Sequence, residues 1–497
     1  MMWGTTRPRA ITFQLQPIKR LVRSDQRASA PIRSHRHITQ QASPAQETEN
    51  VRLMLKLAAT IRQRNPTPAK PRMPTRLMTR SWAEEAQARA EAATSGSSSE
   101  RSDTEMLSDI DDATEERLLR PKRMHESLVE LSLPFASQPE ILERYIATSG
   151  LIRLGKIFED LDNLAGDISY THVLQGRPKA GEQSRIPIFI VTASVDRLDL
   201  LQPLRADRDY RLRGGVIYVG SSAMEVLVTV VELGNSGSET ICLTGRFTMA
   251  TRNAKTGRSQ RIAPLLLETE EEQKLFQMGE DHKKRKRAFS ETSLDRVPPT
   301  REEVALLHTQ WLQASKVQND TDLQHVRNTA LTSTQHMHPQ QRNVHMKVFG
   351  GYLMRAAYEL AWMTAASFVN APVSFLALDA LSFHAPVPIG AVLSLSSNVV
   401  YTHTPESQHS ARPPEQAGLE ESLAAVTVLA EVVDLKTAVR TKSNTFTFTF
   451  SLANSSKHVV PDSYSEAMAW IEGKRRVDLG QELRSLYASE RARSKAN

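Results

Sequence analysis

Residues 351–368 read GYLMRAAYELAWMTAASF, and the fold assignment depends on this stretch. Apolar or small side chains occur on almost every face of the helix that it predicts, which indicates burial on most sides. Runs rich in Val, Ile, Thr and Phe follow at 373–383, 391–401, 424–434 and 443–452. The last run alternates Thr and Phe from Thr445 to Phe450. Alternation with period two predicts a strand with one buried face.

The same order of signals occurs earlier in the chain. Residues 153–169 predict a helix, because Ile157, Leu161, Leu164 and Ala165 recur at helical spacing. Strand-like runs separated by Gly or Ser/Asn turns follow at 186–195, 211–219, 224–233 and 240–250. A long apolar helix followed by several strands, twice over, predicts an α+β protein in which an antiparallel sheet wraps each central helix. The expected architecture is two fused hotdog-like domains.

The composition is that of a globular protein. The 497 residues are 40% hydrophobic and 24% charged, and the length suits two ordinary domains with extra segments. No run approaches the roughly 20 apolar residues of a membrane helix, because Glu431 and Asp434 interrupt the best candidate, 423–435. The single cysteine, Cys242, excludes an intrachain disulfide and lies in an apolar run. It is interpreted as a buried core thiol; the alternative is a nucleophile activated by a neighbour.

The chain begins with a basic segment. Residues 1–46 carry eight Lys and Arg residues against one acid, Asp25, and are rich in Ser, Thr and Gln. This composition is typical of a mitochondrial targeting presequence, and a nucleic-acid-binding arm is the competing interpretation. A second basic run, Lys283 to Arg287, has no interleaved aromatic residues, so we interpret it as a solvated connector rather than a nuclear or nucleic-acid signal.

Composition shifts divide the rest of the chain. The expected segments are a disordered or partly helical linker at 47–120, hotdog domain 1 at 121–255, a helical connector at 256–325, hotdog domain 2 at 326–460 and a C-terminal helical tail at 461–497. Within the connector, residues 301–316 predict a helix. A polar insertion with two prolines, 402–421, predicts a loop.

The buried helix of the second half follows a polar loop. Residues 339–351 read PQQRNVHMKVFGG. Two glycines at a helix entrance let a ligand approach the backbone, and the first-turn N–H groups point outward with the positive end of the helix dipole. Gly350 and Gly351 therefore mark a candidate oxyanion or carbonyl site. Asn343 stands eight positions before Gly351, and its amide can orient water or a carbonyl.

Asn343-x-His345 followed by Phe349-Gly350-Gly351 resembles the Asn-containing loop and Gly-Gly helix start of the hotdog acyl-CoA thioesterases. In that family a helix Asp seven positions after the last glycine completes the site. Here that position is Tyr358, with Glu359 one place off.

The first half has the opposite defect. Asp162 stands seven positions after Gly155, but Ala147 occupies the place of the Asn. Because paired hotdog units of this family build each site from both partners, the resemblance implies one intact site from Asp162 and Asn343. It also implies an inactive mirror site with Ala147 and Tyr358. The alternative for Glu159, Asp160 and Asp162 is a solvated acidic patch, although Asp162 borders the apolar stripe.

Three further stretches carry the resemblance, which covers about residues 120–475: RLGKIFEDLD at 153–162, VGSSAMEV at 219–226 and GGYLMRAAYELAW at 350–362. They are similar to the mitochondrial, double-hotdog acyl-CoA thioesterases. The resemblance implies hydrolysis of acyl-CoA to free fatty acid and coenzyme A in the mitochondrial matrix. It also implies an intramolecular hotdog pair that can assemble into higher homo-oligomers. The sequence has no evident metal-ligand cluster or nucleotide-binding Gly-rich motif, so we expect no metal, no cofactor and no nucleic-acid partner.

The resemblance also implies roles for the site residues. Backbone N–H groups near Gly350 and Gly351 polarise the thioester carbonyl, Asp162 acts as general base or nucleophile, and Asn343 holds the water or substrate. His345 is a candidate supporting donor, with a structural role as its alternative. Two other functions compete with hydrolysis: a non-catalytic acyl-CoA binder or sensor, and a hotdog dehydratase. The dehydratase is disfavoured because the chain has no Asp-x-Asn-x-x-His run.

Overall fold

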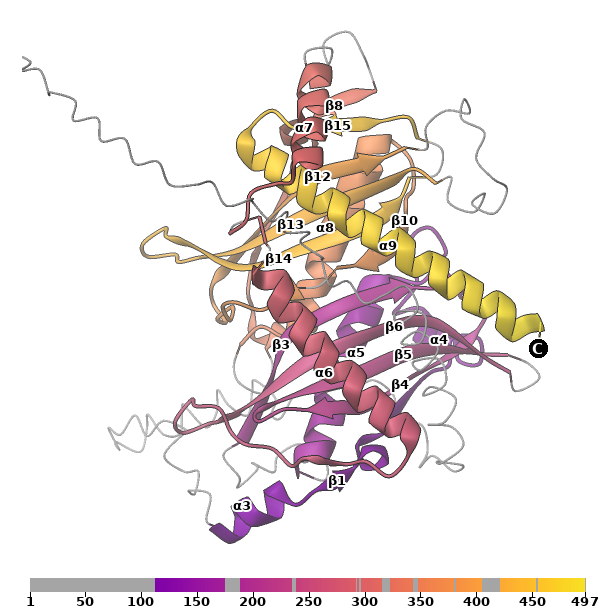
Figure 1. Cartoon of the computed structure of the whole chain (residues 1–497), viewed down its shortest axis with the longest axis vertical. Coiled ribbons are helices and arrows are strands. Elements are labelled where there is room, and N and C mark those ends of the chain that lie inside the picture. Colours follow the sequence, from indigo (N-terminus) through magenta and orange to yellow (C-terminus); the bar gives the residue numbers. More distant parts are fainter. Residues whose placement is uncertain are drawn as a thin grey trace, which may run out of the picture. The chain divides into compact units, whose positions relative to one another are not determined.

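A computed structural model gives the architecture of the chain (Figure 1). It describes residues 112–174, 188–234, 238–291, 293–294, 296–314, 322–342, 347–379, 381–404, 421–452 and 455–496. The chain divides into two units, 1–41 and 42–497, and all described residues belong to the second. The predicted presequence, 1–46, lies outside the described residues. So do most of the predicted 47–120 linker and most of the 402–421 loop.

The first half of the unit packs a sheet around one buried helix, α5 (Leu154–Leu174). Its strands are β2 (Val129–Leu133), β3 (Ile188–Leu200), β4 (Asp209–Val219), β5 (Ala223–Leu233) and β6 (Glu239–Asn253). They pair antiparallel in the order β2-β4-β5-β6-β3. The shorter elements are α3 (Asp112–Leu119), β1 (Lys122–Arg123), α4 (Pro139–Leu142) and β7 (Leu265–Leu266).

The second half repeats this plan around α8 (Gly350–Val369). Its strands are β9 (Leu331–His336), β10 (Ser374–Leu378), β11 (Leu381–Ser382), β12 (Val392–His403), β13 (Leu423–Val433) and β14 (Arg440–Ser451). The sheet runs β10-β14-β13-β12-β9. Outside it, β8 (Leu323–His325) pairs with β15 (His458–Val460).

The strand order of the whole sheet reads the same from both ends. β2, β4, β5, β6 and β3 of the first half correspond to β9, β12, β13, β14 and β10 of the second. The halves join where β3 pairs with β10, with Ala377 opposite Asp199 and Leu378 opposite Leu198. The protein is therefore α+β, with two fused hotdog domains, as the duplicated pattern predicted.

The structure confirms both predicted central helices and a strand within each predicted strand run. The first strand of each half, β2 and β9, was not expected. β2 has only five residues and β9 reads LTSTQH, so neither is long and apolar enough to stand out from the loops. Cys242 is fully buried in the core, which confirms its interpretation as a core thiol. No helix among the described residues has the length and apolar character to cross a membrane.

Two long helices, α6 and α9, lie over the sheet on the side away from the central helices (Figure 1). α9 (Tyr464–Ala496) belongs to the expected C-terminal helical tail. α7 (Arg301–Ala314) confirms the predicted connector helix, but α6 (Glu270–Glu291) was not expected. Its sequence is highly charged, yet Leu275 and Met278 pack against Ile217 and Leu227. The run from Lys283 to Arg287, interpreted from the sequence as a solvated connector, lies within this helix.

Candidate active site

The two central helices approach closely where α8 begins. A β-carbon on Gly351 would lie 2.8 Å from Glu159 Cα and 3.0 Å from Glu159 O, both backbone atoms of α5. Only a residue without a side chain fits this crossing without moving one helix. The Gly-Gly start of α8 is thus required by the packing of the two domains as well as by the chemistry expected of it.

Asp162 of α5 reaches the first turn of α8. Its Oδ2 accepts a hydrogen bond of 2.7 Å from the Gly351 N–H, and its Oδ1 accepts one of 2.8 Å from the Thr192 hydroxyl. A β-carbon on Gly350 would stand 3.0 Å from Oδ2. The first domain therefore supplies the carboxylate, and the second supplies the helix N-terminus that contacts it. Such a helix end favours negative charge.

The environment of Asp162 suits a group that exchanges a proton near neutral pH. Burial raises the pKa of the carboxyl to about 6, while the hydrogen bonds from Thr192 and Gly351 oppose that rise. The side chain is 2% exposed. Because the pKa lies below 7, the carboxylate is mostly ionised at neutral pH and can accept a proton.

The contact between Asp162 and Gly351 bears on the expected oxyanion donors. The Gly351 N–H donates to the carboxylate, so it is not available to a thioester oxygen while that hydrogen bond stands. The phenyl ring of Phe383 covers the same helix start, with its Cζ 3.3 Å from the position of a Gly350 β-carbon. Phe383 follows β11 and is held by its own N–H, which donates to Ala193 O.

Asn343 and His345 lie outside the described residues, in the gap at 343–346. The residues on either side of the gap are tied to each other. Phe349 N–H donates to Gln341 O at 3.0 Å, and Arg342 forms a β-bridge with Val348. Both ends of this loop therefore meet at the N-terminus of α8, the helix end that contacts Asp162.

Thr192 is a site residue that the sequence reasoning missed. It lies on β3, within a correctly predicted strand, but period two would place it on the same sheet face as Ser194. The pairing of β3 with β6 shifts register between Thr192 and Ser194, which is a β-bulge. Thr192 consequently contacts α5, whereas Ser194 accepts a hydrogen bond from Lys286 of α6. No sequence signal marks this bulge.

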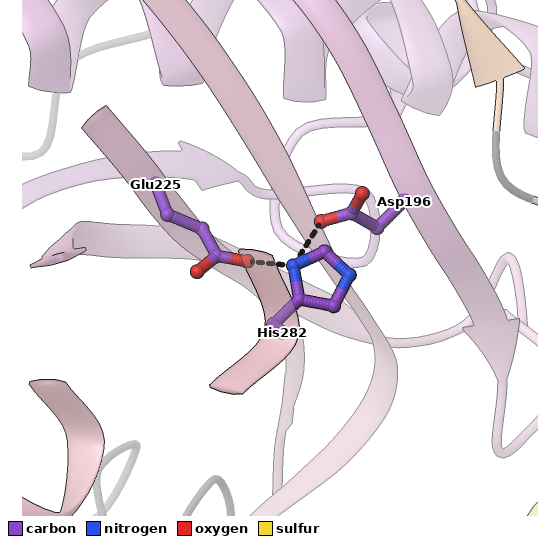
Figure 2. A group of neighbouring side chains, drawn as sticks. All are labelled: Asp196, Glu225 and His282. Carbon is purple, nitrogen blue, oxygen red and sulfur yellow. Dashed lines mark ion pairs between the residues drawn. The ribbon is translucent and has the colours of Figure 1, made fainter. Parts of the chain in front are cut away.

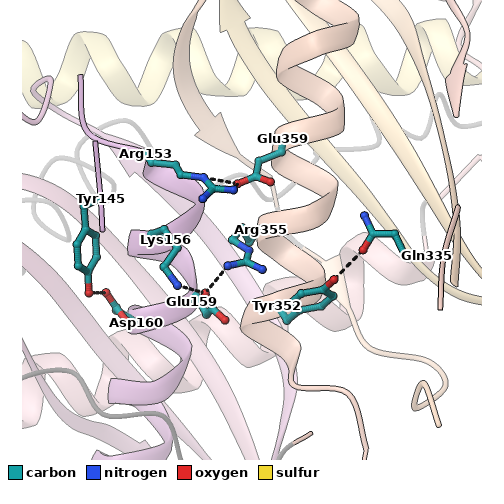
Figure 3. Close-up of polar contacts among 9 residues, drawn as sticks. All are labelled: Tyr145, Arg153, Lys156, Glu159, Asp160, Gln335, Tyr352, Arg355 and Glu359. Carbon is teal, nitrogen blue, oxygen red and sulfur yellow. Dashed lines mark hydrogen bonds and ion pairs between the residues drawn. The ribbon is translucent and has the colours of Figure 1, made fainter. Parts of the chain in front are cut away.

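The interpretation of Glu159, Asp160 and Asp162 as a solvated patch is wrong, because all three are buried. Glu159 pairs with Lys156 at 2.7 Å and with Arg355 at 3.1 Å, and Asp160 accepts a 2.7 Å hydrogen bond from Tyr145 (Figure 3). Each buried acid thus has a partner, which is the condition for burying charge.

The contact between Glu159 and Arg355 joins equivalent positions of the two domains. Glu159 stands four residues after Gly155, and Arg355 four residues after Gly351. Two identical units would place the same residue at both positions. The duplicated halves of a single chain can instead place an acid opposite a base, and Figure 3 shows this pair between the two helices.

The position of the second domain that is equivalent to Asp162 holds an aromatic residue, Tyr358. The aromatic ring of Tyr358 lies beside Gly155, with Cδ1 3.4 Å from the position of a β-carbon there. It packs against Phe158 and Phe375. The nearby carboxylate, Glu359, forms an ion pair of 2.7 Å with Arg153 (Figure 3). An aromatic ring therefore replaces the carboxylate at the position equivalent to Asp162.

Asp162→Asn should stabilise the protein at neutral pH. The carboxyl has its ordinary pKa of 3.8 when unfolded and about 6 when folded, so the folded state binds more protons between these values. The free energy of unfolding of the parent protein falls as pH rises through this window. Above the window, ionisation of the buried carboxyl has lowered that free energy by roughly 3 kcal/mol. The neutral amide avoids that cost. In urea unfolding we expect the variant to be more stable at about pH 7.5 and the difference to vanish near pH 4. A difference independent of pH would contradict the burial of an ionisable carboxyl here.

Known proteins resemble this chain over most of its length. No family model matches it. Acyl-coenzyme A thioesterase 9, mitochondrial, of Homo sapiens is 35% identical over 368 residues, which is 72% of this chain and 78% of that protein. Acyl-coenzyme A thioesterase 2, chloroplastic, of Humulus lupulus is 30% identical over 379 residues, covering 73% of this chain and 82% of the plant protein.

The solved structures that are similar to this chain are more distant in sequence. An acyl-CoA hydrolase from Staphylococcus aureus, in complex with butyryl coenzyme A, coenzyme A and coenzyme A disulfide, is 19% identical with a TM-score of 0.29. It covers 35% of this chain and 99% of its own. An acyl-ACP thioesterase from Bacteroides thetaiotaomicron is 10% identical with a TM-score of 0.36, covering 65% of this chain and 98% of its own. By the identity and coverage of its curated relatives, the chain belongs to the acyl-coenzyme A thioesterase family.

Proposed function

We propose that the chain hydrolyses acyl-CoA at one composite site, in which Asp162 of the first domain and Asn343 of the second act together. Membership of the family makes it a thioester hydrolase that releases fatty acid and coenzyme A. The observation that carries the composite site is the hydrogen bond between Asp162 and the Gly351 N–H, which joins an ionisable carboxylate of one domain to a helix N-terminus of the other. The intramolecular pair of hotdog domains is then the catalytic unit.

In the proposed reaction, Asp162 removes a proton from a water molecule that attacks the thioester carbonyl carbon. The carbonyl oxygen becomes an oxyanion, and the C–S bond breaks as the tetrahedral intermediate collapses. The departing thiolate takes the proton from Asp162. A direct attack by Asp162, forming an anhydride that water then cleaves, is the alternative course.

The Gly351 N–H can serve both partners in sequence. It donates to the ionised Asp162 in the resting enzyme. Protonation of the carboxylate weakens that hydrogen bond at the stage when negative charge develops on the substrate oxygen. The N–H groups of Gly350 and Gly351 then stabilise the oxyanion. Asn343 holds the water or the carbonyl in line, His345 is a supporting donor, and Thr192 positions the carboxylate.

Asp162→Asn and Asn343→Ala should each remove most thioester hydrolysis, by about 100-fold or more, because each removes a group that acts on the reacting atoms. Release of free thiol from a panel of acyl-CoA lengths measures the loss. Tyr358→Phe is the matched control at the mirror position and should retain near-parental activity. Full activity of either of the first two variants would remove the composite site, and a large loss in Tyr358→Phe would mean that the wrong half was judged inactive.

Thr192→Val should shift the acid limb of the pH profile of kcat/KM upward, by up to about one pH unit. The hydroxyl hydrogen bond holds the pKa of Asp162 down, so its loss raises that pKa and delays formation of the active carboxylate. Thr192→Ser keeps the donor and should keep the parental profile. A profile unchanged in Thr192→Val would show that the carboxyl titrating in catalysis is not Asp162.

We further propose that the enzyme acts in the mitochondrial matrix and that residues 1–46 direct it there. The basic composition of this segment and the mitochondrial relatives support that location. The chloroplastic relative from hop shows that location varies within the family, so the presequence carries the assignment. Imaging the chain with and without residues 1–46 tests it. Assembly into higher homo-oligomers stays a prediction, to be checked by light scattering.

A further inference from the structure

A second polar cluster lies under α6, on the opposite side of the first domain's sheet from α5. It consists of Asp196 from β3, Glu225 from β5 and His282 from α6 (Figure 2). The Nδ1 atom of His282 lies 2.8 Å from Glu225 Oε1 and 3.4 Å from Asp196 Oδ2. Figure 2 shows the imidazole between the two carboxylates, with Nδ1 directed at both.

The sheet holds the two acids in fixed positions. β6 runs between β3 and β5, with Val195 opposite Phe247 on one side and Leu227 opposite Arg246 on the other. Asp196 and Glu225 therefore stand on strands separated by only one other strand. Two backbone ladders set their spacing, so the sheet itself, and not α6, fixes the distance between the two acids.

Asp196 lacks the hydrogen bonds that a buried carboxylate needs. Its side chain is 4% exposed, and neither oxygen receives a hydrogen bond from any residue in the described part of the chain. The basic side chains of His282, Arg246 and Lys286 lie near it, and Lys286 Nζ is 3.6 Å from Oδ1. A buried charge without directional partners is costly, so these oxygens call for a further ligand. Burial raises the pKa of Asp196, although three neighbouring basic groups oppose the rise.

We propose that Asp196, Glu225 and His282 bind a divalent metal cation of the zinc, cobalt or manganese class. One imidazole nitrogen with two carboxylate oxygens is a donor set suited to these ions. Bonds of about 2.0 to 2.1 Å in a tetrahedral site place ligand atoms roughly 3.3 Å apart. The two measured separations from Nδ1, 2.8 and 3.4 Å, are close to that value, and all three ligand atoms lie within 4.8 Å of one another.

Two basic side chains, Lys286 and Arg246, border the site and would lie close to a bound ion. The Nζ of Lys286 donates to Ser194 Oγ and is near Asp196, but its side chain is 41% exposed and can turn into solvent. Arg246 Nε stands 3.8 Å from Glu225 Oε1, too far for a hydrogen bond, and can retain the second carboxylate oxygen. In the absence of a cation, the imidazole Nδ1 of His282 faces both carboxylates, 2.8 Å from Glu225 and 3.4 Å from Asp196.

The bound ion would fasten α6 to the sheet. His282 is the ligand supplied by the helix, and Asp196 and Glu225 are those supplied by the strands, so one ion joins three elements. The ligands stand 29 and 57 positions apart in the sequence, which matches no short metal-binding motif. The site shares no residue with the proposed reaction at Asp162.

The test uses the full-length protein, stripped with a chelator and titrated with Zn²⁺ by calorimetry and with Co²⁺ by visible absorption. We expect one cation per chain and a rise in the thermal unfolding midpoint that chelator reverses. Asp196→Asn, Glu225→Gln and His282→Gln should each weaken binding at least about tenfold and abolish that rise. Asp281→Asn alters an acid beside His282 in α6 that pairs with Lys284 outside the cluster, and should bind as the parent does.

Three outcomes would overturn the proposal: no stoichiometric binding, binding that all three variants retain, and binding that Asp281→Asn weakens equally. The His282→Gln variant guards against misfolding, because its side chain is only partly buried and circular dichroism reports whether the fold persists. Stability that falls with rising pH in the parent but not in His282→Gln, without cation binding, would assign the cluster to an imidazolium ion pair instead.

Discussion

The hydrogen bond between Asp162 and the Gly351 N–H is the interaction on which the proposed function depends. It exists only because α5 and α8 cross at a glycine, and they cross there because β3 pairs with β10 and joins the two sheets. The interaction also gives the carboxylate its chemical character. Burial at the helix crossing raises its pKa, while the helix N-terminus and Thr192 keep enough of it ionised to act as a base.

A single chain allows the two sides of that crossing to differ. Four positions after Gly155, α5 has Glu159, and four positions after Gly351, α8 has Arg355. These two side chains form an ion pair. Position seven holds Asp162 in one and Tyr358 in the other. The first difference places opposite charges against each other across the crossing, and the second places an aromatic ring against Phe158 and Phe375. One of the two equivalent positions therefore holds a buried carboxylate, and the other holds an aromatic ring of the core.

Periodicity in the sequence was sufficient to predict the fold, because Ile157 and Leu161 or the alternating residues from Thr445 to Phe450 record directly which faces are buried. Asp162 was singled out by the resemblance to the hotdog thioesterases rather than by periodicity, and its catalytic role stays a proposal. The role of Thr192 could not be predicted, because it depends on a bulge set by pairing with β6. The burial of Glu159 was missed because its partner, Arg355, comes from a helix about 200 positions away.

The bulge in β3 explains how one strand serves two faces of the sheet. A regular strand would point Thr192, Ser194 and Asp196 to the same side. The shift between Thr192 and Ser194 turns Thr192 toward Asp162 of α5, and leaves Ser194 and Asp196 facing α6. Bulges beside active sites commonly redirect a side chain in this way. The contacts that α6 makes with Asp196 therefore act on the same strand that supplies Thr192 to Asp162, so the position of the Asp162 carboxylate depends on contacts made on both faces of the sheet.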